Sequence, residues 1–105
     1  MPTILGAGTV DIVAVGNTST EILAEDTTRN YARITNMSDE IMYLNFDGAA
    51  VATKGIALAP VDTNGNPVQA GIWETGKDGL LFRGAVNGIT ASGSKNAATF
   101  DVVAP

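Results

Sequence analysis

Short segments in which apolar and polar residues alternate recur along this chain, and residues that favour turns separate them. A period of two is typical of β-strands, because successive side chains of a strand point to opposite faces. The clearest case is residues 30–36, where Ala32 and Ile34 share one face and Tyr31 and Arg33 share the other. We expect the first pair to lie in the core, and the aliphatic parts of the second pair to cover the outer face.

The same pattern predicts a series of short strands at a spacing of roughly ten residues. The predicted strands cover residues 9–15, 20–25, 30–36, 40–46, 56–58, 69–74, 80–82, 85–91 and 97–103. Residues 40–46 are apolar on both faces, which predicts a central strand or a strand at a subunit interface. Residues 49–53 are small and fit either a strand or one helical turn. Together the segments predict an all-β fold, an antiparallel β-sandwich or jelly roll of about eight short strands, whose order the spacing does not reveal.

Two connections carry clear turn signals. Residues 62–67 read Asp-Thr-Asn-Gly-Asn-Pro, and Asn-Gly favours the type I′ turn of a hairpin. Residues 92–96 are predicted to join the last two strands as a second hairpin. The first segment also places oxygen-bearing side chains at the first, third and fifth positions of a calcium-binding loop, but Pro67 replaces the loop's glycine and Trp73 its final glutamate. We therefore interpret residues 62–67 as a turn and not as a calcium site.

The chain of 105 residues is long enough for one hydrophobic core and too short for two ordinary domains. Residues 1–8 are small and apolar, and Gly6 and Gly8 favour an N-terminal arm ahead of a single β-sandwich domain at residues 9–105. The N-terminus lacks the basic start and the long apolar stretch of a signal peptide, so we expect synthesis in a cytoplasm without Sec export.

The composition argues against most enzyme chemistry. Cysteine and histidine are absent, which removes disulfides, thiolate nucleophiles, the commonest general base and the commonest metal ligand. The adjacent carboxylates at residues 25–26 and 39–40 do not make a positioned acid–base pair, because neighbouring strand residues point to opposite faces. We expect no enzyme activity, no bound metal and no cofactor.

The charge of the chain limits its partners. It has 11 acidic and 6 basic residues, which give a net charge of -5. Phosphate backbones and anionic membranes repel an acidic surface, and no apolar stretch approaches the roughly 20 residues of a membrane span. We therefore expect neither a nucleic-acid partner nor a membrane.

Trp73 is the single tryptophan of the chain, and it has three interpretations. In the first it caps one end of the sandwich core, and in the second it anchors a surface contact. In the third it stacks against a sugar ring beside the loop at residues 62–69, which would make the chain a carbohydrate-binding or adhesin module.

Six groups of residues form a further pattern of strands and turns within residues 15–103. They are Arg29-Asn30-Tyr31-Ala32-Arg33-Ile34-Thr35-Asn36, Ser38-Asp39, Ile41-Met42-Tyr43-Leu44, Gly48-Ala49-Ala50-Val51, Gly55-Ile56-Ala57-Leu58 and Gly84-Ala85-Val86-Asn87-Gly88-Ile89. This pattern resembles a family of small virion proteins that are encoded among the head and tail genes of tailed phages. It contains no catalytic signature, and residues 62–69 depart from it as a longer loop.

The resemblance implies a structural virion protein made in the cytoplasm of a bacterial host, and we expect a capsid decoration (cement) protein. Such a protein would bind the capsid exterior as a homotrimer, with the major capsid protein and its own subunits as partners. The expected subunit interface consists of Met42, Tyr43 and Phe46. The N-terminal arm would add a strand to a neighbouring subunit or to the capsid protein; its expected capsid-binding residues are Pro2, Thr3, Ile4 and Leu5. The alternatives are a tail, baseplate or fibre-base component, and the carbohydrate-binding module.

Overall fold

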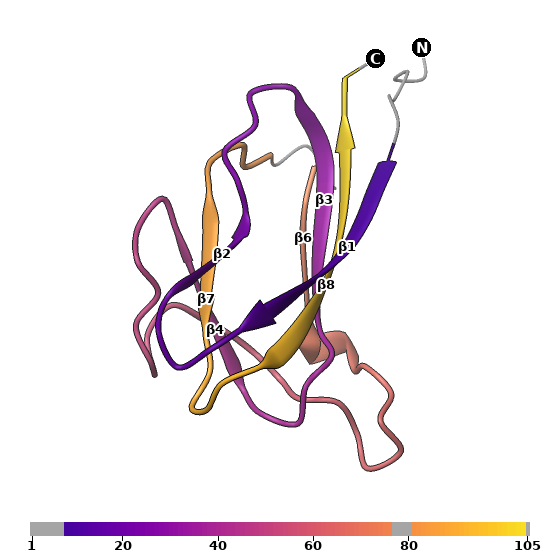
Figure 1. Cartoon of the computed structure of the whole chain (residues 1–105). Helices are drawn as coiled ribbons and strands as arrows, with labels where there is room; N and C mark the ends of the chain where they lie inside the picture. The colour runs from indigo at the N-terminus through magenta and orange to yellow at the C-terminus, as the bar shows by residue number, and fades with distance from the viewer. Residues whose placement is uncertain (1–7, 77–80, 105) are drawn as a thin grey trace.

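The computed structural model describes residues 8–76 and 81–104, and it folds them into two β-sheets packed face to face (Figure 1). The elements are β1 (Gly8–Val15), β2 (Thr20–Leu23), β3 (Arg29–Asn36), β4 (Met42–Phe46), β5 (Ile56–Leu58), the 3₁₀ helix η1 (Gln69–Gly71), β6 (Ile72–Thr75), β7 (Val86–Ile89) and β8 (Lys95–Val103). One sheet has the strand order β1-β8-β3-β6, and the other has the order β2-β7-β4-β5. The predicted all-β sandwich of short strands is confirmed.

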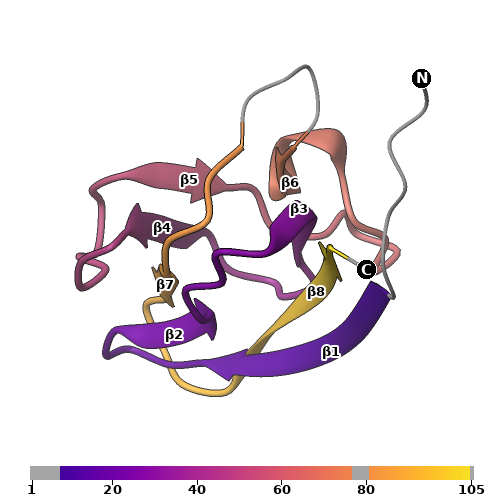
Figure 2. The same cartoon turned by 90° about the horizontal axis from the view of Figure 1, so that it is seen from above.

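The strands pair as a set of nested antiparallel partners. β1 pairs with β8, β2 with β7, β3 with β6 and β4 with β5. The pairs β8–β3 and β7–β4 then join these partners into two sheets, which Figure 2 shows as opposite walls of the sandwich. This nesting is the arrangement of a jelly roll, in which one long double strand is wound into two packed sheets. The topology therefore decides between the two architectures that the strand spacing left open.

The two predicted hairpins are wrong. Residues 92–96 lead from β7 into the start of β8, and these two strands lie in different sheets and do not pair. Residues 62–67 lie between β5 and β6, which also belong to different sheets. The turn itself is present at residues 62–67, where the Asp62 carbonyl accepts the Gly65 N–H at 3.0 Å. The Asp62 carboxylate accepts two further backbone N–H groups of the same turn. The turn centres on Thr63 and Asn64 and is not the predicted type I′ turn, because Gly65 has a positive φ and Asn64 does not. In a jelly roll, both connections change sheet.

The predicted strand at residues 80–82 is also wrong for its described part. Residue 80 lies outside the described residues, and residues 81 and 82 form no strand. The Phe82 N–H donates to the Thr75 hydroxyl at 2.5 Å, and the Phe82 carbonyl accepts from Arg29 at 3.3 Å. Side chains thus satisfy the backbone groups that a neighbouring strand would otherwise pair with.

Two other segments differ from their predictions in a smaller way. Residues 69–71 form η1 and not the start of a strand, since the Gly71 N–H donates to the Val68 carbonyl at 2.9 Å. A side chain at Gly71 would collide with the backbone of Ala59, so the glycine permits this close approach. Residues 49–53 form a loop.

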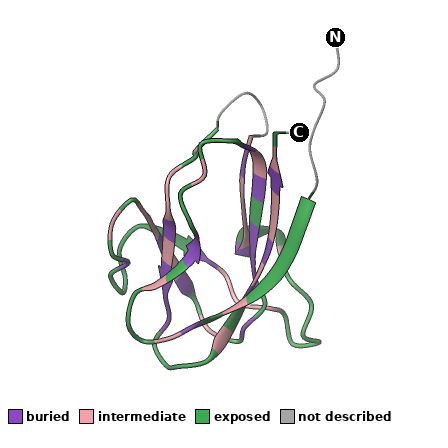
Figure 3. Cartoon of the chain, turned by 45° about the horizontal axis from the view of Figure 1, so that its top comes forward, coloured by how far each residue is buried: buried purple, intermediate pink, exposed green. Residues whose placement is uncertain are grey.

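The hydrophobic core lies between the two sheets. It consists of Val15, Ile22, Leu23, Ala32, Ile34, Met42, Leu44, Leu58, Val86 and Ala97. Ala32 and Ile34 are fully buried, which confirms their predicted place. β4 is an inner strand of its sheet, with Met42 and Leu44 buried and Tyr43 on the outer side. In Figure 3 the buried residues gather on the strands that face one another, whereas the first part of β1 is exposed.

A fully buried arginine fixes the start of β3. The Arg29 guanidinium donates to the Ala24 carbonyl at 2.7 Å, to the Gly84 carbonyl at 3.1 Å and to the Asp101 carboxylate at 3.1 Å. These acceptors belong to the segment after β2, the segment before β7 and β8, respectively. Arg29 therefore ties both sheets together at one end of the sandwich.

A fully buried asparagine fixes the other end of β3. The Asn36 amide nitrogen donates to the carbonyls of Glu40, Leu58 and Ala59 at 2.8, 3.0 and 3.2 Å. Its amide oxygen accepts from the N–H and the hydroxyl of Ser38 at 2.9 and 2.7 Å. Arg29 and Asn36, the first and last residues of β3, are therefore structural, because each satisfies several buried backbone groups.

Candidate functional site

The most exposed apolar side chains of the described residues lie on β1. Val10 and Ile12 are 76% and 58% exposed. Their cross-strand partners on β8 are Phe100 and Ala98, so the four side chains share the outer face of the sheet. An apolar surface of this kind on a strand at the edge of a sheet is typical of a binding surface.

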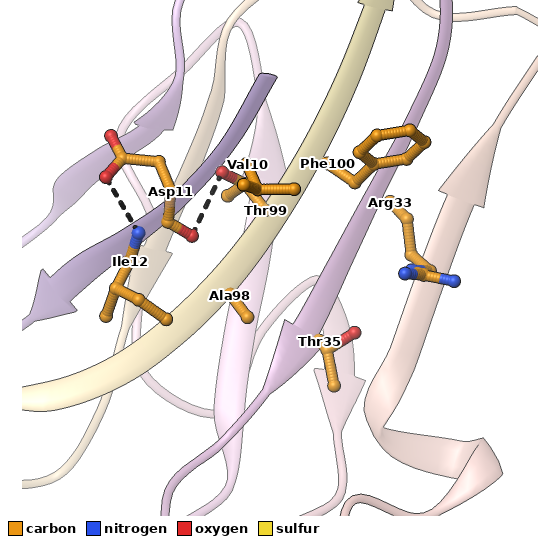
Figure 4. A pocket seen from close by; sticks show the side chains of 8 residues that line it. All are labelled: Val10, Asp11, Ile12, Arg33, Thr35, Ala98, Thr99 and Phe100. Carbon is orange, nitrogen blue, oxygen red and sulfur yellow. Dashed lines mark hydrogen bonds between the residues drawn. The ribbon is translucent and has the colours of Figure 1, made fainter. Parts of the chain in front are cut away.

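The outer face of β1, β8 and β3 forms an open groove of about 470 Å³ (Figure 4). We call it the outer groove, and it is lined by Val10, Asp11, Ile12, Arg33, Thr35, Ala98, Thr99 and Phe100. The register arranges its floor in two rows across the three strands. One row is Val10, Phe100 and Arg33, and the next is Ile12, Ala98 and Thr35. The floor is therefore mainly apolar, with one cation at its β3 side.

Aromatic and charged side chains hold the β3 side of the outer groove in place. The Arg33 guanidinium carbon lies 5.9 Å from the centre of the Phe100 ring, which is a cation–π geometry. The Tyr31 ring contacts Phe100 edge to face at 6.0 Å, and its hydroxyl donates to the Glu74 carboxylate at 2.5 Å. Burial, and secondarily the hydrogen bond to Glu74, raise the pKa of the Tyr31 phenol, so this hydroxyl stays protonated and remains a donor.

A carboxylate covers part of the free edge of β1. The Asp11 carboxylate accepts the Ile12 N–H at 2.8 Å. Residues of an antiparallel strand alternately point their N–H and C=O groups to the partner strand and away from it. The Asp11 carbonyl lies on the β8 side, where the Thr99 hydroxyl approaches it at 3.5 Å, so the Ile12 N–H lies on the free edge. Such an acidic side chain discourages further strand pairing.

The outer face of the second sheet is covered by the loop after β4. The Asn45 and Asn87 amides donate to the carbonyls of Ala49 and Gly48 at 2.9 and 2.6 Å. The Ala50 N–H reaches further and donates to the Ser19 hydroxyl at 2.8 Å. This loop shields the face whose strands include β4 and β7, and the outer groove lies on the opposite side of the molecule.

The residues predicted as a subunit interface do not share one surface. Met42 is fully buried in the core, so its assignment to an interface is wrong, because it has no surface left to offer a second subunit. Phe46 packs against the core and contacts the rings of Trp73 and Phe82 at 5.2 and 5.1 Å. Tyr43 is half-buried on the outer side of β4, where its interface role stays a prediction. The period-two pattern marked β4 as apolar on both faces, but it could not tell a filled core from an interface.

Trp73 faces the interior of the sandwich. Its cross-strand partner is the fully buried Ile34, and its ring lies against Phe46 and the core. It sits on β6 at the edge of its sheet and remains half-buried. This is the position that the interpretation as a cap of the core predicts. The arm residues Pro2, Thr3, Ile4 and Leu5 lie outside the described residues.

The part of the chain that the structure describes contains no group of acidic side chains arranged as a metal site. Across residues 8–76 and 81–104, no group of three acidic side chains gathers closely enough to hold a metal ion. None of the described segments is a helix long and apolar enough to cross a membrane. The Asp62 carboxylate, the first position of the calcium-like segment, accepts backbone N–H groups at 2.9 Å within its own turn.

Sequence reasoning missed the outer groove, although the alternation of β1 contained a signal. Val10 and Ile12 share one face of the predicted strand, and Val13 and Val15 share the other. Only one of these apolar sets can face the core, and the structure buries Val15 while Val10 and Ile12 stay exposed.

Compared with models of protein families, with curated proteins and with solved structures, the chain shows no significant match to any of them.

Proposed function

We propose that this chain is a structural protein of a tailed-phage virion, a capsid decoration protein that binds the outside of the shell as a homotrimer and acts without catalysis. Its partners on this proposal are the major capsid protein and further copies of itself. Synthesis takes place in the cytoplasm of the bacterial host, and the mature location is the capsid exterior.

The observation that carries the proposal is the outer groove, an exposed and mainly apolar surface on a regular β-sheet. Val10 and Ile12 are exposed there on regular strand backbone, and the register fixes their spacing to Phe100 and Ala98. A surface made of cross-strand pairs on a sheet is suited to permanent protein contact.

The fold and the charge agree with this role. Jelly rolls are common in viral capsid proteins, but lectins and cupins share the architecture, so the fold alone is an argument by analogy. The net charge of -5 disfavours direct contact with packaged nucleic acid and leaves a protein surface as the favoured partner. The resemblance of residues 15–103 to small virion proteins supports a location in the virion.

The test is co-sedimentation of the purified chain with DNA-filled heads of the phage that encodes it, after removal of the endogenous copy. Binding to heads that saturates at a fixed number of copies per shell supports the proposal, as does greater resistance of decorated heads to heat or chelators. Binding to isolated tails or baseplates, with none to heads, would replace it with a tail component.

The position of Trp73 argues against the carbohydrate-binding alternative. A sugar-stacking tryptophan needs a free ring face, whereas Trp73 faces inward and its ring contacts Phe46 at 5.2 Å. A glycan array separates the two functions. Specific glycan binding that disappears in a folded Trp73→Ala variant would favour the adhesin and count against the decoration protein.

A further inference from the structure

The outer groove is suited to an apolar, uncharged segment. Its floor presents Val10, Ile12, Ala98 and the ring of Phe100. The two charged side chains at its borders are already engaged, since Arg33 lies over the Phe100 ring and Asp11 accepts the Ile12 N–H. A charged ligand would therefore have to compete for these groups, whereas an apolar one would gain contact with the floor directly.

The face of β1 is a better docking surface than its edge. Adding a strand to the edge requires the Ile12 N–H, which the Asp11 carboxylate occupies at 2.8 Å. The face requires no such exchange, and its side chains Val10 and Ile12 are 76% and 58% exposed. A segment that docks through side chains on the face is therefore favoured over the strand addition that the sequence led us to expect.

The chain itself contains a segment of the right chemistry. Residues 1–7 read Met-Pro-Thr-Ile-Leu-Gly-Ala and carry no charged side chain. Ile4 and Leu5 are the large aliphatic residues at its centre. In an acidic chain, a stretch with no carboxylate is a suitable occupant for an apolar floor.

The geometry at Gly8 favours the segment of a second copy over the chain's own segment. The groove residues Val10 and Ile12 follow Gly8 along β1, so a segment before Gly8 could reach them only if the chain reversed its direction. A Cβ at Gly8 would lie 2.6 Å from the Phe100 ring, so that ring fills the space over which the chain would have to turn back.

We propose that the outer groove of each subunit binds residues 2–5 of a second copy of this chain, with Ile4 and Leu5 seated on Val10, Ile12 and Phe100. Each subunit then gives one segment and receives one, and in the proposed trimer these heterologous contacts close into a ring of three. This inference rests on the proposed function, because it specifies how the subunits of the proposed trimer join.

Disulfide trapping tests the contact directly, because the chain has no cysteine of its own. An Ile4→Cys chain is mixed with an Ala98→Cys chain and oxidised mildly. We expect a covalent dimer that contains one chain of each kind, since a disulfide needs Cα atoms within about 7 Å. The matched control pairs Ile4→Cys with Val51→Cys, an exposed position that does not line the outer groove. Equal trapping at positions 51 and 98, or none at 98, overturns the inference.

A double Ile4→Cys/Ala98→Cys chain at high dilution separates the two sources of the segment. We expect little disulfide within one chain under these conditions. An efficient intramolecular disulfide would show that the chain occupies its own groove and would overturn the exchange between copies.

Solution mass provides a second, independent measurement. Val10→Thr/Ile12→Thr keeps β-branched side chains on an exposed strand, so the fold is retained, but it removes apolar surface from the groove. We expect self-association to weaken by at least about tenfold in native mass spectrometry or sedimentation, with Val51→Thr unchanged. An unaltered oligomer in the double variant contradicts the inference.

The two proposals fail separately. A chain that traps and assembles as expected but does not bind heads keeps this inference and refutes the decoration role. A chain that binds heads as a homotrimer, with no trapping at position 98, refutes this inference alone.

Discussion

Arg29 should be among the residues on which the stability of this protein depends most. It is fully buried, and its guanidinium donates to the Asp101 carboxylate and to the carbonyls of Ala24, Phe82 and Gly84. An Arg29→Met substitution keeps much of the side-chain volume but leaves these acceptors without their donor. The Asp101 side chain is 22% exposed, so its carboxylate is only partly solvated once the guanidinium is gone.

The expected cost follows from that geometry. Breaking one partner of a buried ion pair costs about 3–5 kcal/mol, and each orphaned buried carbonyl adds to the same penalty. A domain of this size has about 5–15 kcal/mol of total stability. At about 4 °C per kcal/mol, a loss of about 3–5 kcal/mol lowers its Tm by about 12–20 °C. We expect Arg29→Met to lose a large part of the free energy of unfolding while remaining folded in the cold.

Urea unfolding followed by Trp73 fluorescence measures this loss, because Trp73 is the single tryptophan and packs against the core. Lys54→Met is the matched control, since it removes one positive charge at an exposed position and should change stability by no more than about 0.5 kcal/mol. Arg29→Met and Lys54→Met of equal stability would refute the role assigned to the buried guanidinium. An Arg29→Met/Asp101→Leu double variant should be less destabilised than the sum of the single ones, because it removes both charges.

Three further substitutions test other parts of the fold. Asn36→Ala should cost about 3 kcal/mol in urea unfolding, because it removes a donor from three carbonyl groups and the acceptor of the Ser38 N–H. A loss below about 1 kcal/mol would contradict the inferred role. Gly76→Ala should destabilise the protein more than Gly65→Ala. Both glycines have positive φ, but only at Gly76 would the new methyl group collide with the backbone of β3. Equal losses of unfolding free energy would count against this clash. The hydrogen bonds from Ser92 lower the pKa of Glu40, so their stabilisation is present at neutral pH and is lost as the pH falls through the lowered pKa, below the ordinary value of about 4.3. The urea unfolding midpoint should therefore decrease less between pH 7 and pH 3 in Ser92→Ala than in the unsubstituted protein. An unchanged decrease would exclude the contact between Ser92 and Glu40 as a contributor.

The sequence predicted most strands because their period of two reflects burial on one side. It placed Ala32 and Ile34 in the core from their spacing alone, and their complete burial agrees. It misread the connections at residues 62–67 and 92–96, because turn chemistry is local whereas pairing is decided by strands far apart in the chain. It also put Met42 at an interface, since a strand that is apolar on both faces has the same pattern whether a core or a partner covers it.

The residues that define the resemblance differ from the residues that we propose to bind a partner, and their burial explains the difference. Arg29 and Asn36 bound the best-defined part of the pattern, and both are fully buried with several backbone partners each. Substituting such residues costs stability whatever the protein binds, so a pattern built on them reports the fold. Val10 and Ile12 lie before residue 15, outside the resembling segment, and are exposed, so the fold leaves them free to change with the partner. The buried residues of the pattern therefore fix the architecture, whereas the exposed residues of the outer groove and the arm determine which partner the protein binds.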